Sequence, residues 1–465
     1  MRSNYNDFVT RKLAITPPAG LSDVPSLTAS LFPHQRDLVT WSLRRGRSAI
    51  FADTGLGKTR MWGEWARCVP ARVIALTPLA VAQQSLDEIA SMGFGHLARA
   101  CRDQSDAGDA KIVITNYERL HLFDPAAFGA VVLDESSCIK HHDTKTLAML
   151  LEAFSRTPWK LCTTATPAPN DWVELGTHAE FLGICSRSEM LAEFFTHDGG
   201  DTSKWRLKGH ARALFWKWVS SWGALVRKPS DLGHDDAGYD LPPLRVHQHV
   251  VATDRVVNRE LGALFVDDAR TLQERRDARR GTITQRVSKC AALVNASDDP
   301  WVVWCDLNAE SNALARAIPD AIEVTGSMEP EAKEAALVAF ARGTHRVIVT
   351  KPSIAGFGLN WQHACKQAFV GVTDSWEAYY QAVRRSWRFG QRSPVDVHLF
   401  VSDLEGAVVA NLTRKEADAK AMASALAAET HEFVRTAVRG ATRETNDYSP
   451  ACTLTVPRWL RSEVV

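Results

Sequence analysis

The sequence contains no long apolar run and no sign of a metal or disulfide framework. No stretch reaches the roughly 18 apolar residues that a membrane-spanning helix needs. The first residues, Met1–Asp7, lack the apolar segment of a secretory signal. The nine cysteines include no Cys-x-x-Cys pair, so neither a zinc site nor disulfide bonds are indicated. We therefore expect a cytoplasmic protein.

The sequence also has no excess of basic or acidic residues. Lys and Arg number 55 and Asp and Glu number 54, so the net charge of +1 does not by itself indicate a polyanionic partner. One local exception lies at residues 270–289, where seven basic side chains accompany only Glu274 and Asp277. The seven are Arg270, Arg275, Arg276, Arg279, Arg280, Arg286 and Lys289. This segment is either a solvated helix between domains or a surface that lines a phosphate backbone.

The length of 465 residues exceeds what a single hydrophobic core normally supports, so two or three domains are expected. Short apolar strand patterns alternate with helical patterns in two separate sets. The first set lies at 48–52, 72–77, 111–115, 130–134 and 160–164, and the second at 301–306, 321–325, 346–350, 367–372 and 396–401. This alternation predicts an α/β fold with two tandem parallel-sheet lobes, a helical insertion between them and a helical C-terminal extension.

The expected division of the chain has five parts. They are an irregular lead-in at 1–26, a first lobe at 27–185, a helical tryptophan-rich subdomain with a basic linker at 186–290, a second lobe at 291–402, and a helical C-terminal extension and tail at 403–465.

The insertion carries an aromatic pattern with helical spacing. Its apolar stripe consists of Ala211, Leu214, Phe215, Trp218, Trp222 and Leu225, whereas Trp216 points elsewhere. Packing of these side chains onto the first lobe is the favoured interpretation, and stacking on nucleic-acid bases is the alternative.

The stretch Phe51–Arg60 has the pattern of a phosphate-binding loop between a strand and a helix. An apolar strand precedes it at 47–52, and a helix follows at 60–66 with its N-terminal amides directed at the loop. The strict pattern has glycine where Ala52 stands, so this is a variant loop with a small residue in that place.

The loop supplies each group that phosphate binding requires. Gly55 and Gly57 leave backbone N–H groups unobstructed, Lys58 offers a cation to the β- and γ-phosphates, and Thr59 offers a hydroxyl to Mg²⁺. The alternative is a glycine-containing turn with a chance Lys-Thr pair.

Two adjacent carboxylates, Asp134 and Glu135, end the apolar strand pattern at 128–133. Ligands bind at the carboxyl ends of strands in a parallel sheet, which predicts that Asp134 lies beside the phosphate loop. Asp134 would then hold Mg²⁺, and Glu135 would orient and deprotonate the attacking water. The alternative is a solvated turn.

Three arginines lie close together in the segment Gln381–Gln391. In a helix Arg385 and Arg388 share one face, whereas Arg384 turns about 100° away from Arg385. The shared face can meet an anion, although arginine-rich helices are ordinarily solvated surfaces.

Together these segments resemble superfamily 2 helicases and translocases, in the Swi/Snf-like branch, and most closely the compact DEAD/DEAH-box-like members of phages and bacteria. The matching segments, in family order, are Leu31–Gln35 for the adenine-side glutamine motif, Asp53–Thr59 for motif I, Asp134–Ser137 with Ile139-Lys140 for motif II, Thr164–Pro167 for motif III, Ser353–Asn360 for motif V and Gln381–Gln391 for motif VI. The sequence departs from the branch at Ala165, where glycine is usual, and at Ser136-Ser137.

The resemblance implies two RecA-like lobes that hydrolyse ATP in the cleft between them, and it implies roles for particular residues. The nucleotide ligands would be Gln35, Asp53, Thr54, Gly55, Leu56, Gly57, Lys58, Thr59, Gly358 and Gln381. Thr59 and Asp134 would hold Mg²⁺. The catalytic residues would be Lys58, Glu135, Arg385 and Arg388, with the two arginines reaching the γ-phosphate.

The function that the resemblance implies is that of an ATP-dependent DNA helicase or double-stranded-DNA translocase. It would track DNA through sequence-independent backbone contacts, with candidates at 77–79, 115–117 and 326–327. We expect a monomer in a bacterial or phage-infected host cell, with replication, recombination or repair proteins as possible partners.

Two other functions remain open. An RNA-remodelling ATPase is disfavoured by Ser136-Ser137, where RNA-directed relatives often carry Ala-Asp. A nucleic-acid-binding adaptor with a decayed ATPase core is disfavoured because Lys58, Glu135 and the motif VI arginines are all intact.

Overall fold

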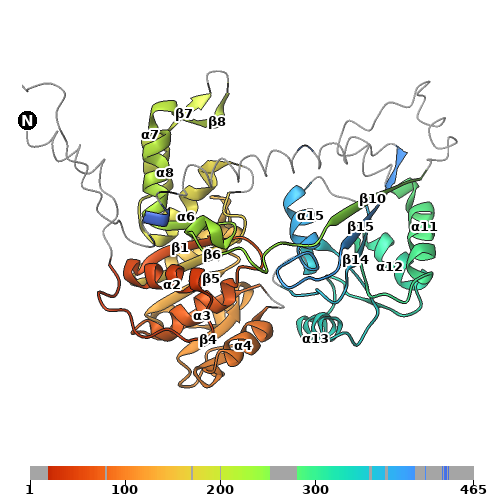
Figure 1. The fold of residues 1–465 in the computed structure, drawn as a ribbon, viewed down its shortest axis with the longest axis horizontal. Coiled ribbons are helices and arrows are strands. Elements are labelled where there is room, and N and C mark those ends of the chain that lie inside the picture. The colour runs from red at the N-terminus through yellow and green to blue at the C-terminus, as the bar shows by residue number, and fades with distance from the viewer. Residues whose placement is uncertain are drawn as a thin grey trace, which may run out of the picture.

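Two parallel β-sheets, each flanked by helices, form the two lobes of the computed structural model (Figure 1). The structure describes residues 19–78, 81–168, 171–198, 201–251, 280–355, 359–371 and 375–403, together with 414, 432, 434–436 and 438. The expected α/β class with two parallel-sheet lobes is confirmed.

The first lobe contains a seven-stranded sheet in the order β3-β4-β2-β5-β6-β1-β9, and every printed pairing in it is parallel. Its strands are β1 (Arg47–Ala52), β2 (Val73–Thr77), β3 (Ala98–Ala100), β4 (Ile112–Asn116), β5 (Ala130–Asp134), β6 (Trp159–Thr164) and β9 (Gly223–Val226). Five of these strands were expected from the sequence, whereas β3 and β9 were not.

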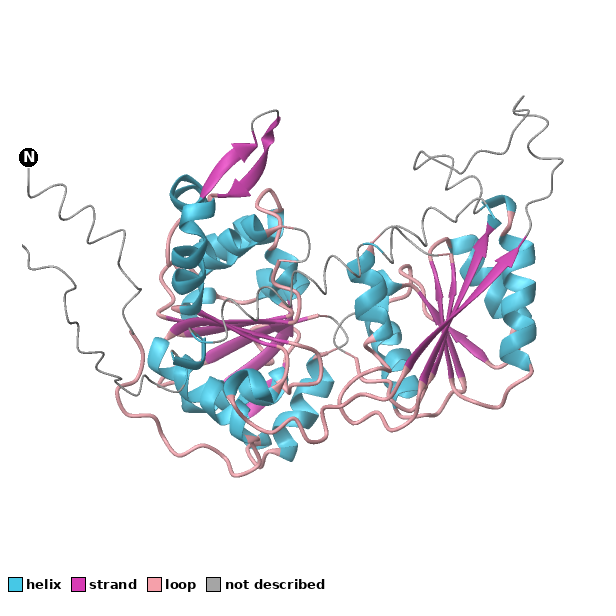
Figure 2. Cartoon of the chain, turned by 45° about the horizontal axis from the view of Figure 1, so that its top comes forward, coloured by secondary structure: helices cyan, strands magenta, loops and turns pink. Residues whose placement is uncertain are grey.

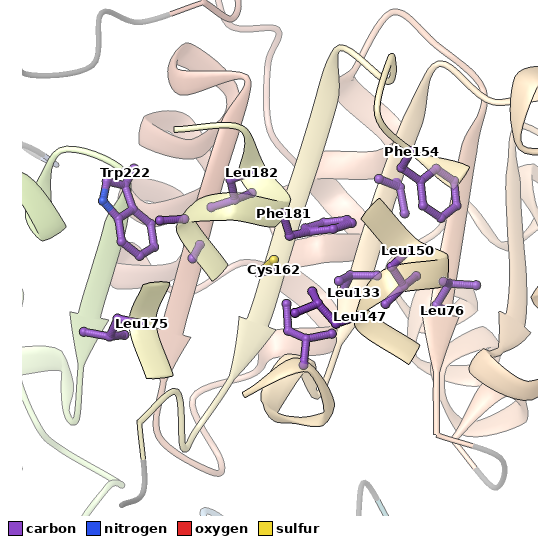
Figure 3. Packing of buried hydrophobic residues seen from close by; sticks show 14 of the residues in the cluster. Leu76, Leu133, Leu147, Leu150, Phe154, Cys162, Leu175, Phe181, Leu182 and Trp222 are labelled. Atoms are coloured by element: carbon purple, nitrogen blue, oxygen red, sulfur yellow. The ribbon is translucent and has the colours of Figure 1, made fainter. Parts of the chain in front are cut away.

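Helices cover both faces of this sheet. They are α2 (Pro33–Arg45), α3 (Lys58–Cys68), α4 (Ala82–Ser91), α5 (Lys145–Ala153) and α6 (Leu175–Leu182), with short 3-10 turns at Gly95–Leu97, Tyr117–Leu122, Pro125–Ala127, Ser136–Ile139 and Trp172–Glu174. Alternate residues of β1 enter opposite cores, because successive side chains of a strand point to opposite faces. Figure 3 shows one of these cores, in which Leu147 and Phe181 pack near Leu133 and Cys162.

The insertion is not wholly helical. Helices α7 (Arg187–Phe194) and α8 (Arg212–Ser220) flank an antiparallel hairpin of β7 (Phe195–Asp198) and β8 (Asp201–Leu207), with a 3-10 turn at Gly209–Ala211 before α8. The hairpin projects beyond the helices in both views (Figures 1 and 2). Strand β9 then returns to the first sheet and pairs with β1, so this sheet continues past residue 185, the expected end of the lobe.

The second lobe contains a six-stranded parallel sheet in the order β10-β15-β14-β11-β13-β12. Its strands are β10 (Leu244–Val251), β11 (Trp301–Cys305), β12 (Ala321–Glu323), β13 (Val347–Thr350), β14 (Lys366–Val370) and β15 (Val395–Ser402). Its helices are α11 (Ile283–Asn295), α12 (Asn308–Ala317), α13 (Pro330–Ala341), α14 (Pro352–Ala355) and α15 (Trp376–Val383). A segment that contains the 3-10 turn Pro229–Leu232 joins the lobes.

Strand β10 and helix α11 belong to the second lobe, although β10 and the first part of α11 fall in the segment 186–290 that was expected to form the insertion and linker. Arg286 of α11 is fully buried and forms an ion pair with Glu310 at 2.8 Å. This member of the basic cluster therefore stabilises the lobe and is not available to a phosphate backbone. Residues 270, 275, 276 and 279 of the cluster lie outside the described residues.

The C-terminal extension is described only at a few positions, of which Val434 and Val438 pack in a core of the first lobe. The rest of the expected helix lies outside the described residues. Within the described residues, no helix is long and apolar enough to cross a membrane.

The buried aromatic side chains of the insertion differ from the expected stripe. Phe215, Trp216 and Trp222 are buried, whereas 50% of Leu214 is exposed. Trp216 packs edge-on against Trp172, with ring centroids 4.9 Å apart. Packing of the stripe onto the first lobe is confirmed, because Ala211, Phe215 and Trp222 lie in its core and Trp218 and Leu225 pack against it. The expectation was wrong at Leu214, which is exposed, and at Trp216, which is buried. The stripe also does not follow one helix, because α8 ends at Ser220 and β9 begins at Gly223.

We predict that Trp216→Ala and Trp222→Ala each lower the free energy of unfolding by about 3–5 kcal/mol, because each leaves a cavity in the core. Leu214→Ala on the same helix is the control and should change it by less than about 0.5 kcal/mol. Denaturant unfolding measures the effect. A Trp222→Ala protein that keeps its stability but loses DNA affinity would support base stacking instead.

Candidate active site

The loop between β1 and α3 adopts a conformation that only glycine tolerates at two positions. Gly55 has φ of 91° and Gly57 has φ of 79°, both in the left-handed region. A Cβ atom on Gly57 would lie 2.3 Å from Nε2 of Gln35, and one on Gly55 would lie 2.7 Å from Cβ of Phe389. The loop is therefore closely packed by both lobes, and a larger residue at either glycine would displace it.

Gln35 holds the loop from the side of α2. Its Nε2 donates to the carbonyl of Leu56 at 3.0 Å, and its Oε1 accepts from the N–H of Phe32 at 3.0 Å. Lys58 at the start of α3 donates from Nζ to the carbonyl of Ala52 at 3.2 Å, so its ammonium group lies across the loop. The expected nucleotide residues Gln35 and Lys58 therefore both bind carbonyls of the segment 52–56, which links β1 to α3.

The two expected carboxylates lie at the end of β5, with Asp134 its last residue and Glu135 the next, and both are buried. Oδ1 of Asp134 accepts a hydrogen bond from the Thr163 hydroxyl at 2.8 Å, and Oε2 of Glu135 accepts one from the Thr164 hydroxyl at 3.4 Å. Burial and the neighbouring Glu135 charge raise the pKa of Asp134 to about 6, whereas Lys58 acts in the opposite direction. Strand β6 pairs with β1 on one side and with β5 on the other, so the phosphate loop and the two carboxylates lie at the same end of the sheet.

Glu135 has a strained backbone. Its φ of 52° makes it the only non-glycine residue with positive φ in the described part of the chain. Such a conformation costs of order 1–3 kcal/mol for an ordinary residue and is concentrated at functional sites.

His178 of α6 lies behind the turn that follows β5, and sequence reasoning missed it. The fully buried ring places Nε2 3.1 Å from the hydroxyl of Ser136, the residue after Glu135. The ring also packs edge-on against Phe51, which leads into the phosphate loop, at 5.3 Å between centroids. A lone histidine in a helix gives no local signal of such a contact across 42 residues.

The three arginines do not lie on one helix, because α15 ends at Val383. The expectation of one helix on which Arg384 turns about 100° away from Arg385 is therefore wrong, and Arg384 faces the first lobe. Its Nη2 lies 2.9 Å from Oδ2 of Asp53, and its guanidinium also donates to the hydroxyl and the carbonyl of Thr54. Arg384 therefore contacts the phosphate loop directly.

Arg385 and Arg388 are held inside the second lobe. Arg385 donates to the carbonyls of Gln381 at 2.9 Å and Leu359 at 3.0 Å, and Arg388 donates to Leu359 at 3.3 Å. Burial and like charges lower the pKa of both guanidinium groups, and the carboxylate of Glu135 opposes this shift. Both remain charged at neutral pH. The two arginines thus lie within electrostatic range of the expected base.

Other groups join the lobes at the same interface. The hydroxyl of Tyr380 donates to Oδ1 of Asp53 at 3.0 Å, and Nε2 of Gln381 donates to the hydroxyl of Thr166 at 3.4 Å. Lys140 forms an ion pair with Glu377. The segments 164–167 and 381–391 therefore contact each other, whereas Gly358 lies outside the described residues.

An aromatic cluster adjoins Gln35 and includes residues from both lobes. Tyr239 lies 4.4 Å from Phe389, 5.5 Å from His34 and 6.5 Å from Phe32, measured between ring centroids. Phe32 is 44% exposed, so part of the cluster is open to solvent. Planar apolar faces of this kind suit a nucleobase. Sequence reasoning named Gln35 alone, although Phe32 and Phe389 stand inside the quoted motifs.

The candidate nucleic-acid contacts at 115–117 are mostly buried. The amide of Asn116 accepts from the N–H of Arg119 at 3.0 Å, and the hydroxyl of Tyr117 donates to the carbonyl of Asp134 at 2.8 Å. These side chains stabilise the first lobe. Gly326 and Ser327 are exposed, and Leu79 lies outside the described residues.

The expected metal ligands are the hydroxyl of Thr59 and the carboxylate of Asp134, both hard oxygen ligands of the kind Mg²⁺ binds. No group of three His, Cys, Asp or Glu side chains that could hold a metal occurs in the described part of the chain. Mg²⁺ ordinarily binds one or two carboxylates and completes its shell with substrate phosphates and water, so this ligand set fits it.

No family model matches the chain, and a comparison with curated proteins also gives no match.

The buried histidine predicts a loss of stability in acid. Burial lowers the pKa of His178 from 6.5 to about 4, so between these values the unfolded chain binds a proton that the folded protein does not. Stability should therefore fall as the pH decreases from 6.5 to 4, by about 2–3 kcal/mol from this residue. His178→Gln should reduce the slope, and the exposed His142→Gln should not. Urea unfolding at several pH values measures it, and equal slopes in all three proteins would contradict the prediction.

Proposed function

We propose that the chain is a nucleic-acid-dependent ATPase, specifically an ATP-driven DNA helicase or double-stranded-DNA translocase. The observation that supports the proposal is that the strand register and the contacts of Arg384 and Phe389 with the loop bring three groups to one interface. These are the glycine loop with Lys58, the buried carboxylates Asp134 and Glu135, and the arginines of the second lobe.

In this proposal the first lobe binds the nucleotide. The loop amides and Lys58 would hold the β- and γ-phosphates, and Gln35 with its aromatic neighbours would hold the base. Thr59 and Asp134 would hold Mg²⁺, which would neutralise charge on the phosphates. Glu135 would accept a proton from the attacking water, and its fixed backbone would aim the carboxylate.

The second lobe would complete the reaction. Arg385 and Arg388 would stabilise the charge that develops on the transferred phosphoryl group, and both lie within electrostatic range of Glu135. Hydrolysis would then depend on how the lobes are apposed, which couples chemistry to movement along a strand. The preference for DNA over RNA rests on the resemblance of motifs II and VI alone.

We expect Lys58→Ala to abolish ATP hydrolysis and to weaken nucleotide binding, because it removes the loop cation. Glu135→Gln should still bind nucleotide but should hydrolyse it about 10²-fold or more slowly, because the amide cannot accept the proton. Glu152→Gln on an exposed part of α5 is the control. Phosphate release and nucleotide binding are measured on each protein. Near-normal turnover by Glu135→Gln would mean that another group activates the water.

The nucleic acid on which the protein acts is identified by measuring the ATPase rate with single-stranded DNA, duplex DNA, forked DNA and RNA in parallel. Stimulation by RNA alone would favour the RNA-remodelling alternative. Nucleic-acid binding without any phosphate release would favour the adaptor with a decayed core.

We expect Arg385→Ala and Arg388→Ala to lower kcat by about 10³-fold or more, with a smaller change in ATP affinity, because they act on the transition state. Arg385 also holds the Leu359 carbonyl, so the melting temperature of each variant is measured beside its kinetics. Arg385→Lys keeps the charge and should be milder than alanine if charge alone matters. Small, equal losses in all variants would contradict the two-lobe mechanism.

A further inference from the structure

Arg384 and Asp53 form an ion pair between the lobes, directly at the phosphate loop, in which the arginine is buried and the aspartate is partly buried. Nη2 of Arg384 lies 2.9 Å from Oδ2 of Asp53, and the side chains are only 6% and 28% exposed. Among the described residues, two other ion pairs join the lobes. Lys140 with Glu377 is also mostly buried, at 17% and 13% exposed, but neither residue belongs to the phosphate loop, whereas Arg119 with Glu331 leaves 63% of the glutamate exposed. An exposed pair contributes little to stability, whereas breaking a buried pair leaves an uncompensated charge.

The surroundings fix both partners of the pair. The guanidinium of Arg384 lies against the rings of Tyr380 and Trp387, at 5.5 and 5.2 Å from their centroids. Asp53 accepts from the Tyr380 hydroxyl at 3.0 Å and from the N–H of Thr54 at 2.7 Å. Burial alone would raise the pKa of Asp53, but Arg384 and these donors hold the pKa below its usual range. Asp53 is therefore a charged acceptor at neutral pH.

The pair also determines the conformation of the loop. Besides Asp53, Arg384 binds the hydroxyl and the carbonyl of Thr54, the residue before Gly55. On the other side of Gly55, the backbone N of Phe389 lies 2.9 Å from where a Cβ would be. Arg384 and Phe389 thus hold the first three residues of the loop from the second lobe.

We propose that Arg384 and Asp53 form a latch that sets the spacing of the lobes and positions the phosphate loop for nucleotide. Arg384 is a positioning residue in this proposal, because its guanidinium is occupied by loop atoms. Its effect on turnover rests on the proposed ATPase function, whereas its effect on lobe spacing does not. The latch lowers the cost of bringing the lobes together around a ligand.

The test is a double-mutant cycle with Arg384→Ala, Asp53→Asn and the double variant. Asp53→Asn keeps the shape of the side chain, so it tests the charge even if Arg384→Ala folds poorly. Dyes at the exposed positions 152 and 342, attached through unnatural amino acids, report the distance between the lobes by energy transfer. Arg119→Ala, which breaks the exposed interlobe pair, is the matched control.

We expect each single variant to broaden and lengthen the interlobe distance and to raise KM for ATP about 10-fold or more, with kcat changed less. The double variant should be no worse than either single variant, because the same interaction is lost once. Arg119→Ala should change neither quantity.

Two results would overturn the latch. The first is an interlobe distance that is unchanged in both single variants, which would contradict the latch whether or not these variants hydrolyse ATP. A loss of kcat in Arg384→Ala alone, with Asp53→Asn normal, would instead make Arg384 a group that contacts the phosphates. If the unmodified protein hydrolyses no ATP, the proposed function fails, but the distance measurements still decide whether the latch exists.

Discussion

The site depends on the alignment of β1, β6 and β5 as parallel neighbours in the first sheet. Their register pairs Phe51 with Thr164 and Asp134 with Thr163, so the three strands end at one edge. The central strand β6 supplies the hydroxyls that bind the carboxylates after β5, and the loop after β1 lies on its other side. Hydrogen bonding between strands thus determines the distance between the loop lysine and the carboxylates, and side-chain flexibility contributes little to it.

Two carboxylates at this edge experience opposite environments. Asp53 has an arginine partner from the second lobe, and its pKa is lowered despite burial. Asp134 has a carboxylate neighbour, and its pKa is raised. The charge of Asp53 is therefore balanced by an arginine of the protein, whereas a bound cation would stabilise the charged form of Asp134.

The sequence predicted the elements whose signal is local, and it failed where the decisive contact is remote. The apolar strands and the glycine loop carry their own patterns, so ten strands and the position of Lys58 and Asp134 could be predicted. The contact of Arg384 with Asp53 joins residues more than 300 positions apart, and the end of α15 at Val383 is marked by neither glycine nor proline. Short edge strands such as β9, and a buried pair such as Arg286 with Glu310, likewise depend on partners that no local pattern reveals.

The return of the insertion to the first sheet makes it part of the nucleotide lobe. Strand β9 pairs with β1 along Ala49–Ala52, and the carbonyl of Val226 accepts from the N–H of Asp53 at 3.0 Å. Excision of the insertion would leave β1 as a bare edge and would remove the acceptor that fixes the first residue of the loop. The hairpin and its helices therefore cannot be removed without disturbing the first lobe. Any force on them is transmitted through β9 to β1 and to Asp53, the first residue of the phosphate loop.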